Sequence, residues 1–132
     1  KYPKYFRVFS SCNRNFKILN LHLGGVVRRH LRGDRMGSSE VLGKWCAKCA
    51  KCLFVFVCLG AFLSKEKVLN IVGKNLLDDK DLIPLFEELI GVRNFKPFEC
   101  VGTPEETRDA LRKIIERKEF NNAFLIKHFK AL

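Results

Sequence analysis

The longest apolar run in the chain extends from Leu53 to Leu63 and contains no charged side chain. A helix that is apolar on every side is normally buried, so the run predicts a central core helix over residues 49–63. A helix needs about 20 apolar residues to span a bilayer. Because this run is shorter, we expect a core element and no membrane segment.

The residues after this run have the spacing of shorter amphipathic helices. Ser64 is placed to cap a helix over 65–72, and Gly73 is placed to end it. The acidic stretch 78–81 predicts the start of another helix, since carboxylates are favourable at the positive end of a helix dipole. Pro84 fits near the first turn of that helix.

Thr103 marks the clearest helix start in the sequence. Pro104 follows at the first helical position, and Glu106 stands where it can close a capping box with Thr103. We expect this helix to continue until the two asparagines at 121–122 break it. A last short helix is then predicted over 123–132.

The N-terminal part has a different pattern. Alternating residues at 5–9 predict a short strand, and the glycine- and arginine-rich residues 20–43 predict a basic loop with room for a short helix at 26–31. The predicted fold class is therefore mainly α, a small bundle of four or five helices with a short N-terminal strand. Within this single domain we distinguish a basic segment, 1–52, from a helical bundle, 53–132.

The distribution of charge supports that division. Of the net charge of +11, residues 1–52 contribute +10, from twelve Lys and Arg against two acidic residues, and residues 53–132 contribute +1. A cationic segment favours an anionic partner such as nucleic acid, a nucleotide or a phosphorylated substrate. Neither Gly-x-Gly-x-x-Gly nor a Walker motif occurs in the chain, which excludes the two common glycine-rich phosphate loops.

Three of the six cysteines, Cys46, Cys49 and Cys52, stand just before the apolar run with two residues between neighbours. Cysteines this close chelate soft metals well and make poor disulfide staples. Since no secretory signal is visible either, we expect a reducing, cytoplasmic setting. Cys12, at the end of the predicted strand, is the candidate fourth ligand, since structural zinc takes four ligands in a tetrahedron.

Two further interpretations of the cysteine set stay open. His22 or His30 can replace Cys12 as the fourth ligand, and a [4Fe–4S] cluster also uses Cys-x2-Cys-x2-Cys with a remote fourth cysteine. Lys48 and Lys51 lie between the cysteines, where their charges offset that of a four-thiolate centre.

Two cysteines lie outside this set. Cys58 lies within the apolar run and is expected to be a buried thiol. Cys100 follows Glu99 in a predicted connector, and a carboxylate beside a thiol is suited to acid–base chemistry. A buried loop thiol is an equally good interpretation of Cys100.

Three blocks of sequence resemble a known family. Residues 10–17, 45–52 and 96–102 read SSCNRNFK, WCAKCAKC and KPFECVG. In this order they resemble the C-terminal region of the UDP-N-acetylmuramoyl-L-alanyl-L-glutamate epimerases. The cysteine set is also similar to that of the cyanodeazaguanine synthases, which are PP-loop ATPases with a four-cysteine zinc site.

The resemblance implies an ATP-dependent inversion of the terminal L-glutamate of a UDP-linked muramoyl dipeptide, a step in peptidoglycan synthesis. Adenylation of the carboxylate would acidify the α-proton. It also implies an N-terminal PP-loop domain, with a Ser-Gly-Gly-x-Asp-Ser type loop that binds ATP and Mg²⁺. No such loop occurs in this sequence, which begins with Lys1. We therefore interpret the chain as the C-terminal part of a larger α/β PP-loop ATPase, inactive by itself.

The resemblance also suggests roles for individual residues. The four-cysteine zinc site would be structural, since four thiolates leave no position open for water. Arg14, Lys17 and Lys48 are the candidate contacts to substrate or nucleotide phosphates. Glu99 and Cys100 are the candidate acid–base residues.

Two other hypotheses belong to different classes of protein. A basic zinc module would bind nucleic acid through Arg28, Arg29, Arg32 and Arg35. It lacks the aromatic residues beside the basic run on which single-stranded nucleic acids stack. The third hypothesis is an iron–sulfur electron carrier.

Overall fold

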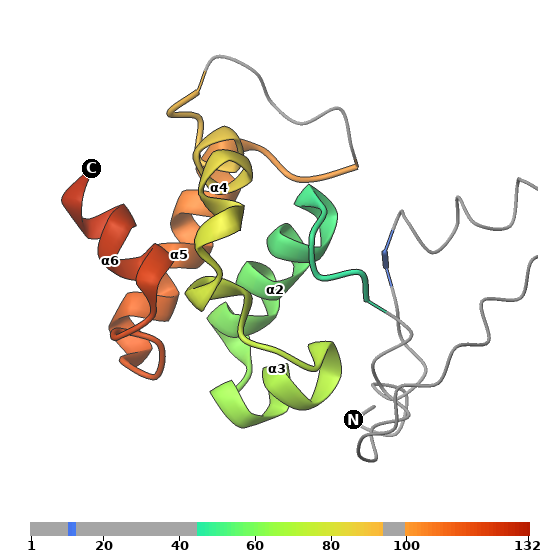
Figure 1. The fold of residues 1–132 in the computed structure, drawn as a ribbon. Helices are drawn as coiled ribbons and strands as arrows, with labels where there is room; N and C mark the ends of the chain where they lie inside the picture. Colours follow the sequence, from blue (N-terminus) through green and yellow to red (C-terminus); the bar gives the residue numbers. More distant parts are fainter. Residues whose placement is uncertain (1–10, 13–44, 94–99) are drawn as a thin grey trace, which may run out of the picture.

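The structure is a computed structural model that describes residues 11–12, 45–93 and 100–132 (Figure 1). These residues form a helical bundle with no strand among them. With η denoting a short 3-10 helix, the elements are α2 (Ala50–Phe62), α3 (Lys65–Val72), η3 (Leu76–Asp78), η4 (Lys80–Leu82), α4 (Ile83–Leu89), α5 (Pro104–Arg117) and α6 (Phe124–Ala131). None of the helices in this part of the chain is long and apolar enough to cross a membrane.

The prediction of a mainly α fold is confirmed for the described residues. The strand predicted at 5–9 and the short helix at 26–31 lie outside them. The subdivision of the chain after residue 52 stays a prediction.

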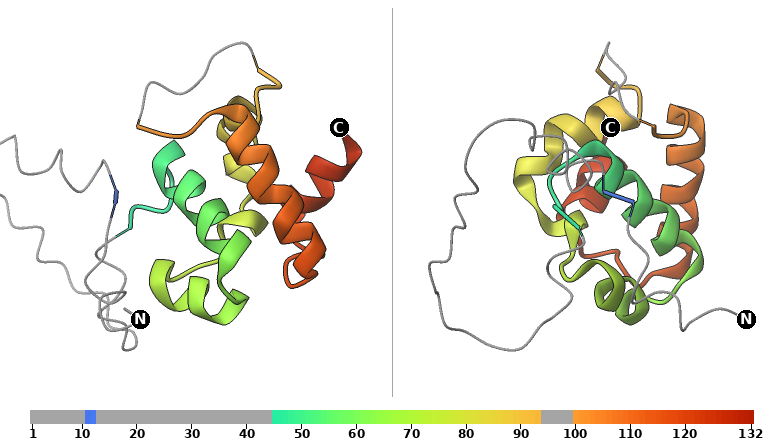
Figure 2. Two further views of the ribbon diagram at one scale, coloured as in Figure 1. Left: turned by 180° about the vertical axis from the view of Figure 1, so that it is seen from behind. Right: turned by 90° about the vertical axis from the view of Figure 1, so that its right-hand side faces the viewer.

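The other helices pack around α2, as the apolar run predicts. α2 contacts α3, α4 and α5, and Leu53, Phe56 and Val57 on it are fully buried. The ring of Phe56 meets that of Phe120 edge-on, with 5.9 Å between the centroids. Figures 1 and 2 show that α2 and α6 lie on opposite sides of the bundle.

α3 begins and ends at the predicted residues. Ser64 occupies the N-cap position, and Gly73 ends the helix with φ +92°, a conformation that glycine adopts at little cost. Within the described part of the chain the Ser64 hydroxyl makes no capping bond. Instead the carboxylate of Glu119 accepts a hydrogen bond of 2.5 Å from the Lys65 amide. The capping role predicted for Ser64 is therefore corrected to Glu119.

The helix predicted to open at 78–81 begins later. The side chains of Asn75 and Asp79 each accept a hydrogen bond from the backbone amide two residues further on. These side-chain bonds favour two short 3-10 turns, η3 and η4, over a regular first turn. The α-helix itself, α4, starts at Ile83, with Pro84 in its first turn as expected.

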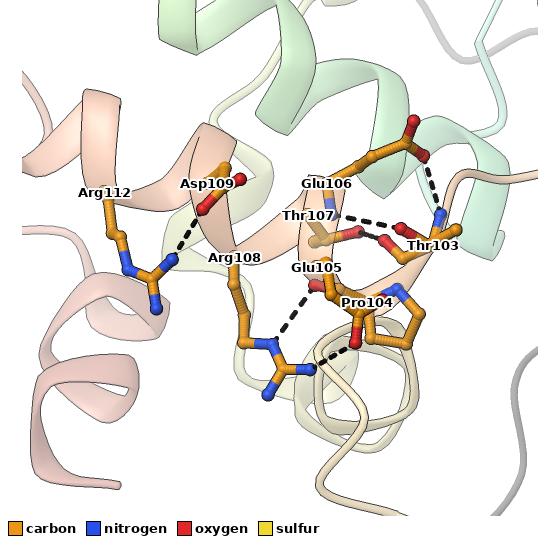
Figure 3. Close-up of polar contacts among 8 residues, drawn as sticks. All are labelled: Thr103, Pro104, Glu105, Glu106, Thr107, Arg108, Asp109 and Arg112. Carbon is orange, nitrogen blue, oxygen red and sulfur yellow. Dashed lines mark hydrogen bonds and ion pairs between the residues drawn. The ribbon is translucent and has the colours of Figure 1, made fainter.

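α5 starts with the capping box predicted at Thr103. The Thr103 hydroxyl accepts a hydrogen bond of 3.2 Å from the Glu106 amide, and the Glu106 carboxylate accepts one of 2.8 Å from the Thr103 amide (Figure 3). Figure 3 also shows two ion pairs between residues three apart on this helix. Such solvent-exposed pairs contribute little to stability, because water and salt screen them.

α5 ends earlier than the sequence predicts. Its last residue is Arg117, and Lys118 has left-handed backbone with φ +64°, ahead of the break expected at 121–122. The early end lets the chain turn back so that Phe120 enters the core, where it is 2% exposed. The burial of one aromatic ring therefore explains the difference.

α6 begins at Phe124, in agreement with the prediction. Its N-cap residue is Ala123, whose side chain has no hydrogen-bond acceptor. Asp78 supplies one, because its Oδ1 atom accepts a hydrogen bond of 3.1 Å from the Phe124 amide. Like α3, this helix is capped by a carboxylate that lies far away in the sequence.

Candidate metal centre

Four cysteine sulfurs gather at the start of α2. Their Sγ atoms all lie within 4.8 Å of one another, and the residues are Cys12, Cys46, Cys49 and Cys52. Three of them belong to the first turn of α2 and the turn before it, and Cys12 stands 34 residues before Cys46. The structure thus brings the three regularly spaced cysteines together with Cys12, the predicted fourth ligand.

Hydrogen bonds from the backbone to sulfur support this arrangement. The Cys46 amide donates to Cys12 Sγ at 3.3 Å, and the Cys52 amide donates to Cys49 Sγ at 3.4 Å. Cys49 is the N-cap residue of α2, so the second bond also satisfies an amide of the first helical turn. Ala47 has a left-handed backbone, φ +54°, which tightens the turn between Cys46 and Cys49.

One pair of sulfurs already has the spacing of a tetrahedral metal site. Zinc–sulfur bonds of about 2.3 Å in a tetrahedron place two sulfurs about 3.8 Å apart. The Sγ atoms of Cys46 and Cys52 are 3.7 Å apart. Cys12 and Cys52 have no exposed surface, so an ion held here would be shielded from water.

The protonation of the cysteines also bears on the metal. Burial raises the pKa of the Cys52 thiol, and its neighbour Cys49 raises it further. Burial likewise raises the pKa of Cys49. Both thiols are therefore neutral near pH 7 without a cation, whereas a metal binds the thiolate and displaces the proton. The donor set favours a soft cation such as zinc or iron.

Lys48 is exposed and lies between Cys46 and Cys49 in the sequence. The pKa of Asp79 is held below its usual value mainly by a hydrogen bond from Lys74, with a smaller effect of the Lys48 charge. The Lys48 side chain is therefore exposed and close enough to Asp79 for its charge to act on that carboxylate. Its contact with phosphate groups stays a prediction.

The two cysteines outside the cluster differ in exposure. Cys58 is half-buried, and burial followed by the charge of Glu106 raises the pKa of its thiol. Cys100 is exposed, so the buried-thiol interpretation of it is wrong. The segment after Cys100 packs on α2, since a Cβ at Gly102 would lie 2.6 Å from the ring of Phe54. Cys100 therefore stands near the same end of α2 as the cluster.

Several predicted site residues lie outside the described part of the chain. They are the phosphate contacts Arg14 and Lys17, the acid–base candidate Glu99, the alternative ligands His22 and His30, and the arginines Arg28, Arg29, Arg32 and Arg35. Their roles stay predictions. Within the described residues nothing favours the binding of nucleic acid.

One polar cluster was not foreseen from the sequence. Glu87 of α4 accepts a hydrogen bond of 2.6 Å from Arg93 Nε and lies 3.0 Å from Nε2 of His128 on α6. These bonds, that from Arg93 first, hold the pKa of Glu87 below its usual value. Glu87 and His128 are 41 positions apart and belong to no motif, so only the folded bundle reveals the pair.

The fold and the cluster define a small helical domain with four convergent cysteines. A family model described as the MurL C-terminal domain matches residues 8–132, and the chain therefore belongs to that family. The resemblance to the epimerases that the sequence suggested is confirmed.

Three curated relatives bear the name UDP-N-acetyl-alpha-D-muramoyl-L-alanyl-L-glutamate epimerase. The protein from Xanthomonas oryzae pv. oryzae is 36% identical over 129 residues, which is 98% of this chain and 25% of the relative. The proteins from Micromonospora sp. and Salinispora tropica are 36% and 35% identical over 94% and 90% of this chain. The chain spans about a quarter of the length of these relatives. No solved structure matches it.

Proposed function

We propose that this chain is the C-terminal, metal-binding domain of an enzyme that inverts the terminal L-glutamate of UDP-N-acetylmuramoyl-L-alanyl-L-glutamate. The reaction supplies the D-glutamate of peptidoglycan precursors. The observation that carries the proposal is the family match over residues 8–132, with three relatives of that name aligned over at least 90% of this chain.

Inversion at the α-carbon requires that its proton leaves from one face and that a proton returns to the other. The α-proton of a free carboxylate is a very weak acid, whereas adenylation removes the negative charge and makes the carbanion more accessible. ATP and Mg²⁺ would serve this activation, bound by a PP-loop domain elsewhere in the protein. In this chain Arg14, Lys17 and Lys48 would contact phosphate groups, and Glu99 and Cys100 would move the proton.

The metal in this proposal is zinc, and its role is structural. The four cysteines would saturate a tetrahedral ion and leave no position for water or substrate. The ion would instead hold Cys12 against the start of α2. The observation that supports this role is the cluster of four sulfurs within 4.8 Å of one another. A [4Fe–4S] cluster is the alternative occupant, and a visible absorption spectrum distinguishes the two.

The proposed reaction is tested on the full-length protein that contains this chain. It is incubated with the UDP-linked L-alanyl-L-glutamate, ATP and Mg²⁺ in D2O, and the glutamate is released by hydrolysis and separated on a chiral column. We expect D-glutamate that carries deuterium at the α-carbon, and none when ATP is omitted. The isolated chain is expected to be inactive. Unchanged L-glutamate without deuterium, in the complete mixture, would contradict the proposal.

A further inference from the structure

Among the residues that the structure describes, one face of α2 is apolar and only partly covered. Its residues are Phe54, Val55, Cys58, Leu59 and Phe62, which helical spacing places on one side of the helix, with Phe54 at the edge against Gly102. The first four are half-buried, and Phe62 is 68% exposed. The other sides of α2 carry the buried residues that face α3, α4 and α5. In the right-hand view of Figure 2, α2 lies in front of the other helices.

This face differs from the outer face of an ordinary surface helix, which carries charged or polar side chains. Between Leu53 and Leu63 the sequence has no charged side chain. The thiol of Cys58 adds no charge near pH 7, since its ordinary pKa is 9.0 and burial raises that pKa further. Exposed apolar side chains that lie together on one face are a common feature of interaction sites.

Charged groups border the apolar face at its N-terminal end and along α5. Lys51 precedes it by one helical turn, and Lys113 of α5 places its Nζ atom 4.8 Å from the centroid of the Phe62 ring. Glu106 lies close enough to Cys58 to raise the pKa of the thiol. An apolar centre with a charged rim is the anatomy of a protein–protein interface.

We propose that this face docks against another domain of the same polypeptide. The curated relatives have about three quarters of their length outside the part that matches this chain. A domain joined to this one is present at high effective concentration, which favours it over a second copy or an unrelated protein. This proposal rests on the proposed function, because it takes this domain to be part of a protein as long as the curated epimerases.

The position of the metal centre is consistent with the docking of another domain of the same polypeptide on this face. Cys12 is bonded through its sulfur to the Cys46 amide, just before the end of α2 at which the apolar face begins. A domain that precedes Cys12 in the polypeptide would therefore connect through a residue that is held at this end of α2. The cluster and the face would then act together, one fixing the connection and the other burying apolar surface.

The test compares Phe62 with Leu132 in the full-length protein. Leu132 has a similar exposure, 63% against 68%, and follows α6 on the opposite side of the bundle (Figure 1). Phe62→Cys and Leu132→Cys are each labelled with a maleimide, and peptide mass spectrometry reads the rate at the introduced thiol. A photo-crosslinking p-benzoylphenylalanine is also placed at Phe62 and, in a second variant, at Val55.

We expect the thiol of Phe62→Cys to react at least tenfold more slowly than that of Leu132→Cys. We also expect crosslinks from Phe62 or Val55 to residues beyond this domain. Equal labelling rates overturn the proposal, and so do crosslinks confined to residues 1–132 or to a second copy. Circular dichroism and metal content confirm that each variant is folded.

These readouts do not depend on catalysis, so the two proposals fail separately. D-glutamate formation with rapid labelling at Phe62→Cys would remove the docking surface and leave the proposed function intact. Slow labelling with external crosslinks, but without D-glutamate formation, would remove the function and leave the docking surface.

Discussion

The carboxylate of Glu119 accepts a hydrogen bond of 2.5 Å from the backbone amide of Lys65, 54 positions earlier in the chain. The amide belongs to the first residue of α3, and Arg117 also donates to the same carboxylate, at 2.7 Å. The first bond, followed by that from Arg117, holds the pKa of Glu119 below its usual value of 4.5. A negative charge is also favourable at this end of a helix.

Replacing this charge should lower stability in a pH-dependent way. Glu119→Gln is expected to unfold at a lower temperature than the wild type at neutral pH. Because the folded-state pKa is lowered, the stabilisation is present above the unfolded pKa near 4.5 and disappears as the pH falls through the folded value. Thermal unfolding at neutral and acid pH checks this, with exposed Glu116→Gln as the control. A difference that persists in acid would contradict the charge-based explanation.

The hydrogen bond from the Phe124 amide to Asp78 predicts a loss of stability when Asp78 is replaced. Asp78→Ala removes the acceptor of the Phe124 amide and should destabilise the domain by about 1 kcal/mol, the usual cost of losing a helix cap. Asp78→Asn keeps an oxygen acceptor and should cost less. Urea unfolding measures both, with exposed Asp81→Ala as the control. If Asp78→Ala and Asp81→Ala cost the same, the cap has no special role.

A methyl group at Gly102 should disturb α2. The added Cβ would lie 2.5 Å from Glu106 Oε2 and 2.6 Å from the ring of Phe54, so either the capping box or the ring must move. We expect Gly102→Ala to cost about 1–3 kcal/mol, as overpacking does. The matched test is the double variant with Phe54→Leu, which has a smaller side chain and should recover part of the loss. Strictly additive effects in urea unfolding would exclude the clash with the ring.

Replacing one cysteine of the cluster is expected to abolish metal binding. Cys49→Ser should lose stoichiometric zinc, measured by elemental analysis, and should also lose stability because metal binding energy is folding energy in such sites. Cys100→Ser is the control, because this thiol is exposed and outside the cluster. Full zinc retention by Cys49→Ser would exclude the site. Iron with a visible absorption band in the wild type would identify the alternative cluster.

Features set by local sequence were predicted well. The capping box of Thr103 and Glu106 needs only residues three apart, and it is present as expected. The apolar run fixed α2 to within one residue at each end, because no polar residue interrupts it. The convergence of the cysteines was also predictable for the three with regular spacing, since one turn of chain must bring them together.

Features set by tertiary neighbours were not predictable in the same way. The sequence around Ser64 favours a local cap, and only the folded bundle shows that Glu119 takes this role. The two side-chain bonds of Asn75 and Asp79 compete with the helix start expected at 78–81, and propensity alone does not rank these alternatives. The pairing of Glu87 with His128 depends on the packing of α4 against α6 and left no sequence signal.

The carboxylates that cap α3 and α6 lie far from these helices in the sequence, which affects when each helix can form as the chain is synthesised. The residue that caps α3 lies after α5, and the residue that caps α6 lies after α3. While the ribosome is still translating α5, the first turn of α3 lacks its acceptor, and α6 does not yet exist. The cap of α3 is complete only once residue 119 has been synthesised, and that of α6 only once residue 124 has. Both helices are therefore expected to reach their full stability only late in the synthesis of the domain.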